Sequence, residues 1–260
     1  MILQDVINII ESVAPLSYQE SWDNSGLQVG DRNAEVHAAL LTVDITESVV
    51  NEAIEKHCDL IISHHPLLFK GLKRITGSTP QERCVEMAIR NNIAIYSAHT
   101  SMDAYIDGVS GKIARKLGIN LFQILSPNFN NPQTGLGVIG TLPQPMNSQE
   151  FIQLVQQVFN ASIRYIEPCR EQIQKVAICG GAGAEFVHQA IAQQADIFIT
   201  ADMKYHEMQA AFGQIGVIDM DHWVSEHFTR EIFEDLLKSH IRTYIAETDT
   251  TPIKWIINNE

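Results

Sequence analysis

The apolar positions in the first part of the chain alternate between helical and strand periods. Residues 2–14 carry apolar side chains at helical spacing, which predicts an amphipathic helix that Pro15 ends. Short apolar runs at 38–43 and 58–63 predict buried strands, and a helix over 48–56 connects them. Alternation of this kind predicts an α/β fold with a parallel or mixed sheet flanked by helices.

The pattern continues with a helix near 80–91 and a strand at 93–96, and then the composition changes. Residues 120–150 are rich in proline, asparagine and glycine, which predicts a linker and an irregular strand. We therefore expect a first α/β lobe over 1–125 and a second over 126–260. The C-terminal tail could return to pack on the first lobe.

The second half of the chain repeats features of the first. Residues 44–63 align with 181–200 at a constant offset, helix pattern on helix pattern and strand on strand. Further on, His99-x-x-x-Asp103 is echoed by His222-x-x-x-Glu226. Apolar patterns alone align by chance, but the shared histidine and acid favour an internal duplication. We expect two similar lobes with pseudo-two-fold symmetry and a site in the cleft between them.

Charge argues against one broad class of function. The 260 residues have a formal net charge of −13, so the chain lacks the basic surface of a protein that binds bulk nucleic acid. Lys70, Lys73 and Arg74 form a short basic cluster near the histidines. That cluster favours a solvated loop, and contact with an anionic small molecule is the other interpretation.

The cysteines and the N-terminus indicate the compartment. None of the four cysteines forms a C-x-x-C pair, which predicts buried reduced thiols in a cytoplasmic protein. They are Cys58, Cys84, Cys169 and Cys179. The first residues lack the basic region of a signal peptide, and no uncharged apolar run is long enough to span a bilayer. We expect no membrane association.

His64 and His65 stand at the end of the predicted strand 58–63, immediately before Pro66. The carboxyl ends of strands are where α/β folds place their chemistry. Adjacent strand residues point to opposite faces, so this pair suits two metal ions with one imidazole each. Paired histidines also occur as ordinary turn residues, and the pair alone leaves both interpretations open.

Polar residues close three further predicted strands, and together they suggest a metal centre. They are His99 to Asp103, Asp202 with Tyr205 and His206, and His222 to Glu226. A nitrogen and oxygen ligand set without sulfur suits Zn²⁺, Fe²⁺ or Mn²⁺. A carboxylate can bridge two such ions about 4 Å apart. Taken singly, Asp103 could instead cap a turn, and Glu226 could be a solvated helix residue.

A glycine-rich segment, Gly180 to Gly183, follows a predicted strand at 176–179 and opens a helix. The dinucleotide fingerprint needs glycine where Phe186 stands, so that motif is absent. We interpret the segment as a turn, with contact to an anion as the weaker alternative.

Four motifs together resemble the GTP cyclohydrolase I type 2 homologue family, also called the Nif-three-like family, in its short form. They are residues 22–27 (WDNSGL), 63–69 (SHHPLLF), 98–103 (AHTSMD) and 221–226 (DHWVSE). The resemblance implies two divalent metal ions per subunit. Its matching ligands are His64, His65, Asp103, His222 and Glu226. It also implies a two-lobed α/β subunit in a ring-shaped homohexamer. The chain departs from the family pattern at Ala201, Asp221 and Ser101 without losing an implied ligand.

Two functions from different classes fit these observations. The first is a dinuclear metal-dependent hydrolase that acts on a nucleotide-like or other small anionic substrate through a metal-bound hydroxide. In it Glu226 bridges the ions, and His99 or His206 moves protons. The second is a metal-dependent binding or regulatory scaffold without turnover.

Overall fold

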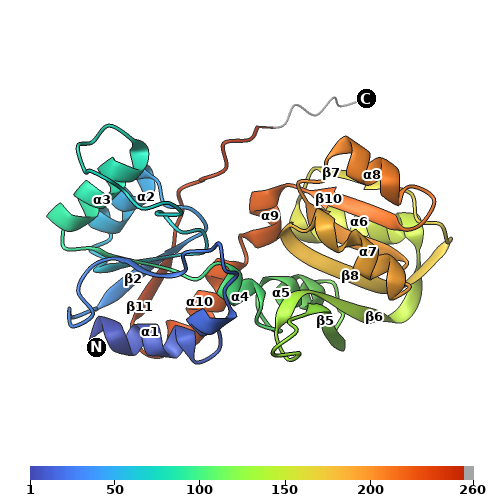
Figure 1. Ribbon diagram of the computed structural model, residues 1–260, viewed down its shortest axis with the longest axis horizontal. Coiled ribbons are helices and arrows are strands. Elements are labelled where there is room, and N and C mark those ends of the chain that lie inside the picture. Colours follow the sequence, from blue (N-terminus) through green and yellow to red (C-terminus); the bar gives the residue numbers. More distant parts are fainter. Residues whose placement is uncertain (255–260) are drawn as a thin grey trace. The chain divides into compact units, whose positions relative to one another are not determined.

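The chain divides into two compact units in a computed structural model that describes residues 1–254 (Figure 1). The first unit comprises residues 1–102 and 229–252, and the second comprises residues 103–228 and 253–254. The sequence placed the division at 125/126. The structure places it earlier, and the chain later returns to the first unit. Residues 255–260 of the predicted second lobe lie outside the described residues.

The first unit is built on a five-stranded sheet in the order β1-β4-β3-β2-β11. Four strands are parallel: β2 (Ala38–Thr42), β3 (Leu60–Ser63), β4 (Ala94–Ser97) and β11 (Arg242–Ile245). The short edge strand β1 (Gly26–Val29) pairs antiparallel with β4. The late strand β11 pairs with β2, so the chain returns to the first unit after residue 228.

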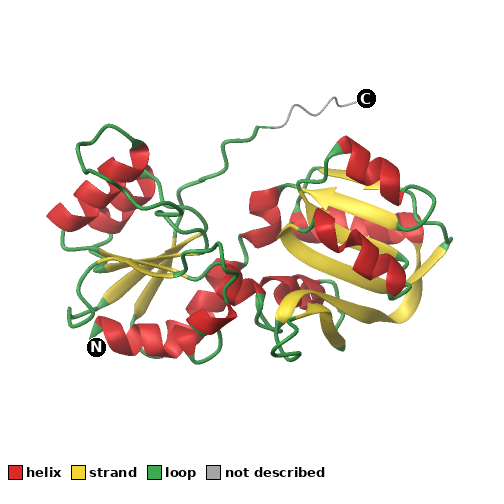
Figure 2. Ribbon diagram, in the orientation of Figure 1, coloured by secondary structure: helices red, strands yellow, loops and turns green. Residues whose placement is uncertain are grey.

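Helices cover the sheet of the first unit (Figure 2). They are α1 (Leu3–Glu11), α2 (Glu47–Glu55), α3 (Pro80–Arg90) and α10 (Thr229–Leu237), followed in size by the short α4 (Thr100–Asp103) and the 3₁₀ turn η1 (Leu16–Tyr18). Threonine side chains cap the N-termini of α2 and α3. Thr46 accepts from the amide of Val49 at 3.2 Å, and Thr79 accepts from that of Glu82 at 3.2 Å. Such caps satisfy amides that lack a helical partner.

The second unit contains a six-stranded sheet in the order β5-β6-β8-β9-β10-β7. Its parallel strands are β8 (Gln172–Ala182), β9 (Ile197–Ala201) and β10 (Gly216–Met220). The antiparallel strands are β5 (Phe122–Pro127), β6 (Gly135–Asn147) and β7 (Ile163–Ile166). Its helices are α5 (Val109–Lys116), α6 (Ser148–Phe159), α7 (Val187–Ala192), α8 (Tyr205–Ala211) and α9 (His222–Glu226), with the 3₁₀ turn η2 (Ala184–Phe186).

The two sheets share a motif of four strands. In the first unit the antiparallel strand β1 lies beside the parallel strands β4, β3 and β2. In the second unit the antiparallel strand β7 lies beside β10, β9 and β8 in the same way. The predicted α/β class with mixed sheets flanked by helices is therefore confirmed. The carboxyl ends of matching strands carry the candidate site residues of each unit.

Residues 120–150 contain two paired strands, β5 and β6, and the second of them is irregular. β5 and β6 pair antiparallel, and β6 also pairs with β8. Glycine is required at 135, because a Cβ there would lie 2.2 Å from the backbone oxygen of Ser126 and φ is +151°. Pro143 and Pro145 fall where the pairing of β6 with β8 is interrupted, so their missing amides cost no ladder bond.

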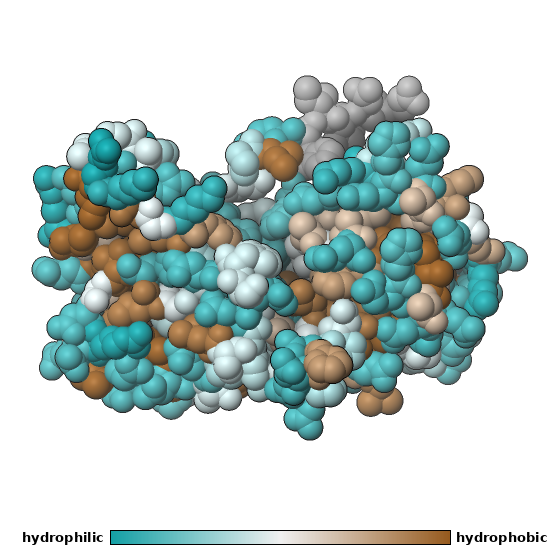
Figure 3. Space-filling model, in the orientation of Figure 1, coloured by the Kyte–Doolittle hydropathy of each residue, from teal (hydrophilic) through white to brown (hydrophobic). Residues whose placement is uncertain are grey.

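The surface is mixed in character, and the cysteines differ from expectation at one position. Figure 3 shows polar residues interspersed with apolar patches over both units. Cys58, Cys84 and Cys179 are buried free thiols, but Cys169 is exposed, which corrects the prediction that all four are buried. Burial raises the pKa of Cys58 and of Cys84 to about 11. Within residues 1–254, none of the helices is long and apolar enough to cross a membrane.

Candidate metal centre

The backbone of β3 continues far enough to hold both histidines of the pair. The His64 amide donates to the Thr42 oxygen at 3.2 Å, and the His65 amide donates to the Val43 oxygen at 2.9 Å. The His64 side chain is fully buried, and its Nδ1 lies 3.1 Å from the oxygen of Ala98. The two ring centroids are 5.0 Å apart. The pair is therefore fixed at the carboxyl end of the strand, as the sequence predicted.

Asp44 orients the second imidazole of the pair, and sequence reasoning missed this role. Its Oδ1 lies 2.7 Å from His65 Nδ1, and its Oδ2 accepts from the hydroxyl of Thr250 at 2.8 Å. Asp44 follows the predicted strand 38–43, so its position at a strand end was the one available signal. Because the Asp44 carboxylate accepts a hydrogen bond, the hydrogen of the neutral His65 ring lies on Nδ1 and the lone pair lies on Nε2.

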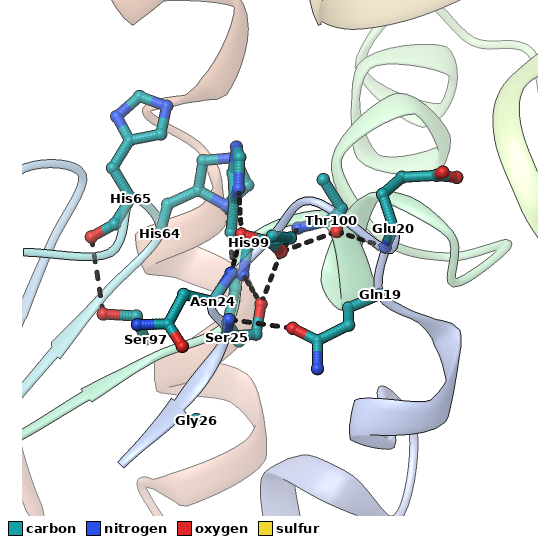
Figure 4. A network of polar contacts seen from close by, with 12 residues as sticks. Gln19, Glu20, Asn24, Ser25, Gly26, His64, His65, Ser97, His99 and Thr100 are labelled. Atoms are coloured by element: carbon teal, nitrogen blue, oxygen red, sulfur yellow. Dashed lines mark hydrogen bonds and ion pairs between the residues drawn. The ribbon is translucent and has the colours of Figure 1, made fainter. Parts of the chain in front are cut away.

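His99 follows β4, and Figure 4 shows it in a network of polar contacts with Ser25 and Thr100. Asp23 holds its ring through Nδ1. Asp23 Oδ1 lies 2.9 Å from His99 Nδ1 and accepts from the Asn24 amide at 2.7 Å. Its Oδ2 accepts from the Thr100 hydroxyl at 2.6 Å, the Thr100 amide at 3.1 Å and the Ser25 hydroxyl at 2.8 Å. Both carboxylate oxygens are thus surrounded by donors.

The Asp23 carboxyl stays ionised in this setting. Burial by itself would raise its pKa. Hydrogen bonds from His99, Thr100 and Ser25, with the charge of His99, outweigh burial and hold the pKa of Asp23 well below its usual range. Because a carboxylate only accepts, the His99 ring must present its Nδ1 hydrogen to Asp23. Asp23 lies in the WDNSGL motif, which the sequence singled out without a role for this residue.

Three imidazoles therefore gather at the carboxyl edge of the first sheet. One ring nitrogen from each of His64, His65 and His99 lies within 4.8 Å of the others, which is close enough for a shared metal ion. The centroid of His99 is 5.2 Å from that of His64 and 5.3 Å from that of His65. The His99 ring thus lies against both members of the pair, and the proton-transfer role that the sequence proposed for it stays a prediction.

In the second unit, helix α9 places His222 and Glu226 on one face. Asp221 caps the helix and accepts from the Val224 amide at 3.3 Å. His222 Nε2 lies 3.0 Å from Glu226 Oε2, as the four-residue spacing predicted. His222 Nδ1 lies 2.7 Å from Asp202 Oδ2. Asp202 has φ +57°, a left-handed conformation that a non-glycine residue adopts at a cost, often at functional positions.

Glycine at 181 makes room for Glu226, whose side chain is 4% exposed. A Cβ at position 181 would lie 2.2 Å from Glu226 Oε1, and φ is +66°. The Gly181 amide donates to the Ser225 hydroxyl at 2.8 Å. Gly180 to Ala182 belong to strand β8, which corrects the prediction of a turn at this segment. Gly181 allows the close approach of the Glu226 carboxylate. The interpretation of this segment as an anion-binding turn therefore has no support.

Asp103 lies in the second unit, where its charge acts on the same thiol as that of Glu226. Burial raises the pKa of Cys179, and the negative charges of Asp103, Glu226 and Glu185 raise it further. Carboxylates thus concentrate around the β8 end of this unit.

His206 lies apart from these groups. It is exposed on α8, with its Nδ1 3.4 Å from Gln209 Oε1 and its ring beside Tyr205. Within the described part of the chain, its contacts do not include Asp202, His222 or Glu226.

The donor set fits a divalent metal ion. Each of the four imidazoles has an acceptor at Nδ1: the oxygen of Ala98 or a carboxylate of Asp44, Asp23 or Asp202. In the neutral tautomer, Nε2 of each ring then carries the lone pair, which is the usual arrangement of histidines that bind metals. In His222 this atom lies 3.0 Å from Glu226 Oε2. Carboxylates of the second unit supply oxygen donors, and no cysteine thiol belongs to the grouped donors among residues 1–254.

The fold and these side chains define an α/β protein with two similar units that carry groups able to hold a metal ion. The chain belongs to the Duf34/NIF3 (NGG1p interacting factor 3) family, whose model matches residues 1–253. A Clostridium acetobutylicum protein named "GTP cyclohydrolase 1 type 2 homolog" is 38% identical over 227 residues, covering 86% of this chain and 85% of its own. A Clostridium perfringens protein of the same name is 37% identical, covering 98% and 100%.

Solved structures agree with the fold. The crystal structure of Staphylococcus aureus protein SA1388 superposes with a TM-score of 0.89 at 26% identity, covering 98% of this chain and 99% of that one. Reduced HcgD from Methanocaldococcus jannaschii has a TM-score of 0.78 at 24% identity, which bears on the fold alone. The resemblance noted in the sequence motifs is confirmed as family membership.

Proposed function

We propose that the protein is a dinuclear metal-dependent hydrolase that acts on a small, nucleotide-like or otherwise anionic substrate. The residues that would hold the two ions are His64, His65, Asp103, His222 and Glu226. The observation that supports it best is the shared orientation of the imidazoles: an acceptor engages Nδ1 of each histidine and leaves Nε2 for a metal ion. An ordinary surface histidine has no such requirement.

Two divalent ions held by these residues would be Zn²⁺, Fe²⁺ or Mn²⁺, and they would lower the pKa of water to give a nucleophile near neutral pH. The protein's own contribution is positioning. Asp44 and Asp202 fix the rings of His65 and His222. His99 keeps its Nδ1 hydrogen on Asp23, so its Nε2 is the atom that can accept a hydrogen bond, and then a proton, from the substrate. His206, which the sequence paired with His99, lies exposed and is left out of the proposed mechanism.

Elemental analysis of anaerobically purified protein tests the metal assignment. Wild type supplied with several metal ions should bind about two ions per chain, and His64→Ala and Glu226→Ala should each bind fewer. Glu86→Gln, which changes a carboxylate in a surface ion pair with Arg90, is the matched control and should bind as many as wild type. Wild type with far fewer than about two ions would contradict the dinuclear centre.

Turnover separates the hydrolase from the non-catalytic scaffold. Metal-loaded wild type should hydrolyse members of a panel of nucleotides, esters and amides, and Glu226→Ala should not. A fully loaded wild type that is inert toward the whole panel would contradict the hydrolase and favour the scaffold. The predicted homohexamer and cytoplasmic location are separate proposals, and light scattering of the purified protein checks the first.

A further inference from the structure

Two exposed aromatic side chains flank the imidazole of His99. The Trp22 ring centroid lies 5.8 Å from that of His99, and the Phe69 centroid lies 5.4 Å from it. The planes of the Trp22 and Phe69 rings make angles of 71° and 86° with the imidazole plane. Trp22 is 61% exposed and Phe69 is 46% exposed. Single exposed apolar residues are ordinary, but two large rings around one buried imidazole indicate a binding surface.

The loops that carry these rings are tied together. The side chain of Asn24 donates to the backbone oxygen of Leu68 at 2.5 Å. The Leu68 amide in turn donates to Gln28 Oε1 at 3.2 Å. These bonds join the neighbours of Trp22 and Phe69 across the gap between the two loops. The backbone that carries the two exposed rings is therefore held in place, which reduces the entropy lost when a ligand binds.

The residue next to Trp22 is anchored still more firmly. Asp23 accepts the hydrogen bonds described above, including the one from His99 Nδ1 at 2.9 Å. One carboxylate thus fixes the backbone beside Trp22 and the tautomer of His99 together. In the neutral ring, His99 Nε2 is then an acceptor and suits a ligand that offers an N–H group.

Positive charge follows the second aromatic residue along the chain. Lys70 is next to Phe69, and Lys73 and Arg74 lie on the same segment before α3. All three side chains are exposed. In a chain with a net charge of −13, a local basic segment that follows Phe69 in the sequence complements a ligand that joins a ring to an anionic group.

We propose that Trp22, Phe69 and His99 form a ring-binding subsite beside His64 and His65. Its ligand is a planar nitrogen heterocycle that bears an N–H donor and an attached anionic group. The heterocycle packs on the two aromatic rings and donates its N–H to His99 Nε2. The subsite rests on the proposed function, because it receives the ring of the same substrate. Packing of a heterocycle on aromatic side chains tolerates many rings, so this surface selects a class of ligand.

Calorimetric titration of the full-length, metal-loaded protein tests the subsite with two probes. Guanosine 5′-monophosphate has the ring, the N–H and the phosphate, whereas ribose 5-phosphate lacks the ring. Trp22→Ala and Phe69→Ala should each weaken binding of the nucleotide by roughly tenfold. Trp22→Phe, which keeps an aromatic ring, should lose less. Binding of ribose 5-phosphate and the metal content should stay as in wild type.

Phe212→Ala is the matched control, because Phe212 is also exposed but lies in the second unit at the end of α8. Its affinity for the nucleotide should equal that of wild type. Equal affinity in Trp22→Ala, Phe69→Ala and wild type would overturn the subsite. So would a wild type that binds both probes equally or binds neither. A Trp22→Ala protein that changes oligomeric state would also overturn it and identify these rings as an interface between copies of the chain.

The outcomes for the subsite and for the proposed function are distinguishable. Ring-dependent binding by a protein that hydrolyses nothing would support the subsite and contradict the hydrolase. Hydrolysis of nucleotides at the same kcat/KM in wild type and in both alanine variants would support the hydrolase and overturn the subsite.

Discussion

The carboxyl edges of the two sheets carry different donors on the same arrangement of strands. In the first unit, the ends of β3 and β4 present three imidazoles, from His64, His65 and His99. In the second unit, the end of β9 carries Ala201 and Asp202, and α9 after β10 presents His222 and Glu226. One edge is therefore rich in nitrogen donors, and the other is rich in carboxylates.

What the two edges share is the residue that follows the third parallel strand. His99 follows β4 with its Nδ1 2.9 Å from Asp23, and His222 follows β10 with its Nδ1 2.7 Å from Asp202. The orienting carboxylates come from different places, Asp23 from the loop before β1 and Asp202 from the end of β9. The scaffold and one oriented histidine are therefore common to both units, whereas the remaining donors are specific to each.

The largest expected effect comes from Gly181→Ala, which would displace a carboxylate at the carboxylate-rich edge of the second unit. The new Cβ would lie 2.2 Å from Glu226 Oε1 at φ +66°, so the carboxylate must move. We expect a loss of unfolding free energy of about 2–4 kcal/mol from overpacking and the left-handed backbone. Metal content should fall as well. Chemical denaturation and elemental analysis measure the two effects.

Gly213→Ala is the control for this substitution. Gly213 also has a positive φ, +75°, but a Cβ there meets nothing within 4 Å. It should cost only about 1 kcal/mol and leave the metal content unchanged. Equal losses of stability and metal in the two variants would show that backbone strain, and not the displacement of Glu226, explains the result.

Asp23→Asn should have the next largest effect, on the imidazole-rich edge. The asparagine NH₂ group would face hydrogen-bond donors at a place where the carboxylate accepts. We therefore expect the unfolding free energy of the metal-free protein at pH 7 to fall by about 2 kcal/mol. Because the pKa of Asp23 is lowered in the folded protein, its ionised form contributes stability above about pH 4, and this contribution is lost as pH falls toward the folded pKa. The difference between wild type and Asp23→Asn should therefore narrow below about pH 4. A difference that is constant from pH 7 to pH 3 in urea denaturation would contradict this account.

The sequence predicted those parts of the molecule that depend on local patterns. Apolar periodicity located the strands that end at Ser63, Ser97, Ala201 and Met220 to within a few residues. The i, i+4 spacing placed His222 and Glu226 on one helical face, and the structure shows that contact. Both rest on short-range rules that a single segment obeys by itself.

Features that depend on distant segments could not be predicted in the same way. Asp23 reaches His99 from a loop far away in the chain, and Asp44 reaches His65 across neighbouring strands. Glycines at 135, 137 and 140 suggested a linker because a strand seldom tolerates them. A Cβ would instead clash with Ser126 of β5 at 135, with Ile178 of β8 at 137 and with the segment 119–122 at 140, so small residues are required there. Glycine at 181 is similarly required by the position of Glu226. Local turn signals in the sequence carry no information about that position.

A smaller effect is expected from the carboxylates that orient one implied ligand in each unit. Asp44→Asn and Asp202→Asn keep an acceptor but remove the charge beside His65 and His222. Each should weaken metal binding by about tenfold, since partners behind a metal ligand typically contribute 10–100-fold. Competition with a chelator gives the affinities. If Asp202→Asn is silent while Asp44→Asn is not, the two edges do not orient their histidines by equivalent means.

The smallest effect is expected from His206→Gln, and it separates the two histidines that the sequence proposed for proton transfer. His206 is exposed on α8, and its contacts are with Gln209 and Tyr205. Its replacement should change unfolding free energy by less than about 0.5 kcal/mol and leave metal content and turnover as in wild type. His99→Gln should lower turnover, because it removes the ring that lies against His64 and His65 and is fixed by Asp23. The pH profile of kcat/KM decides between them. A profile altered by His206→Gln but not by His99→Gln would move the proton-transfer role to the second unit, away from the edge where the three imidazoles gather.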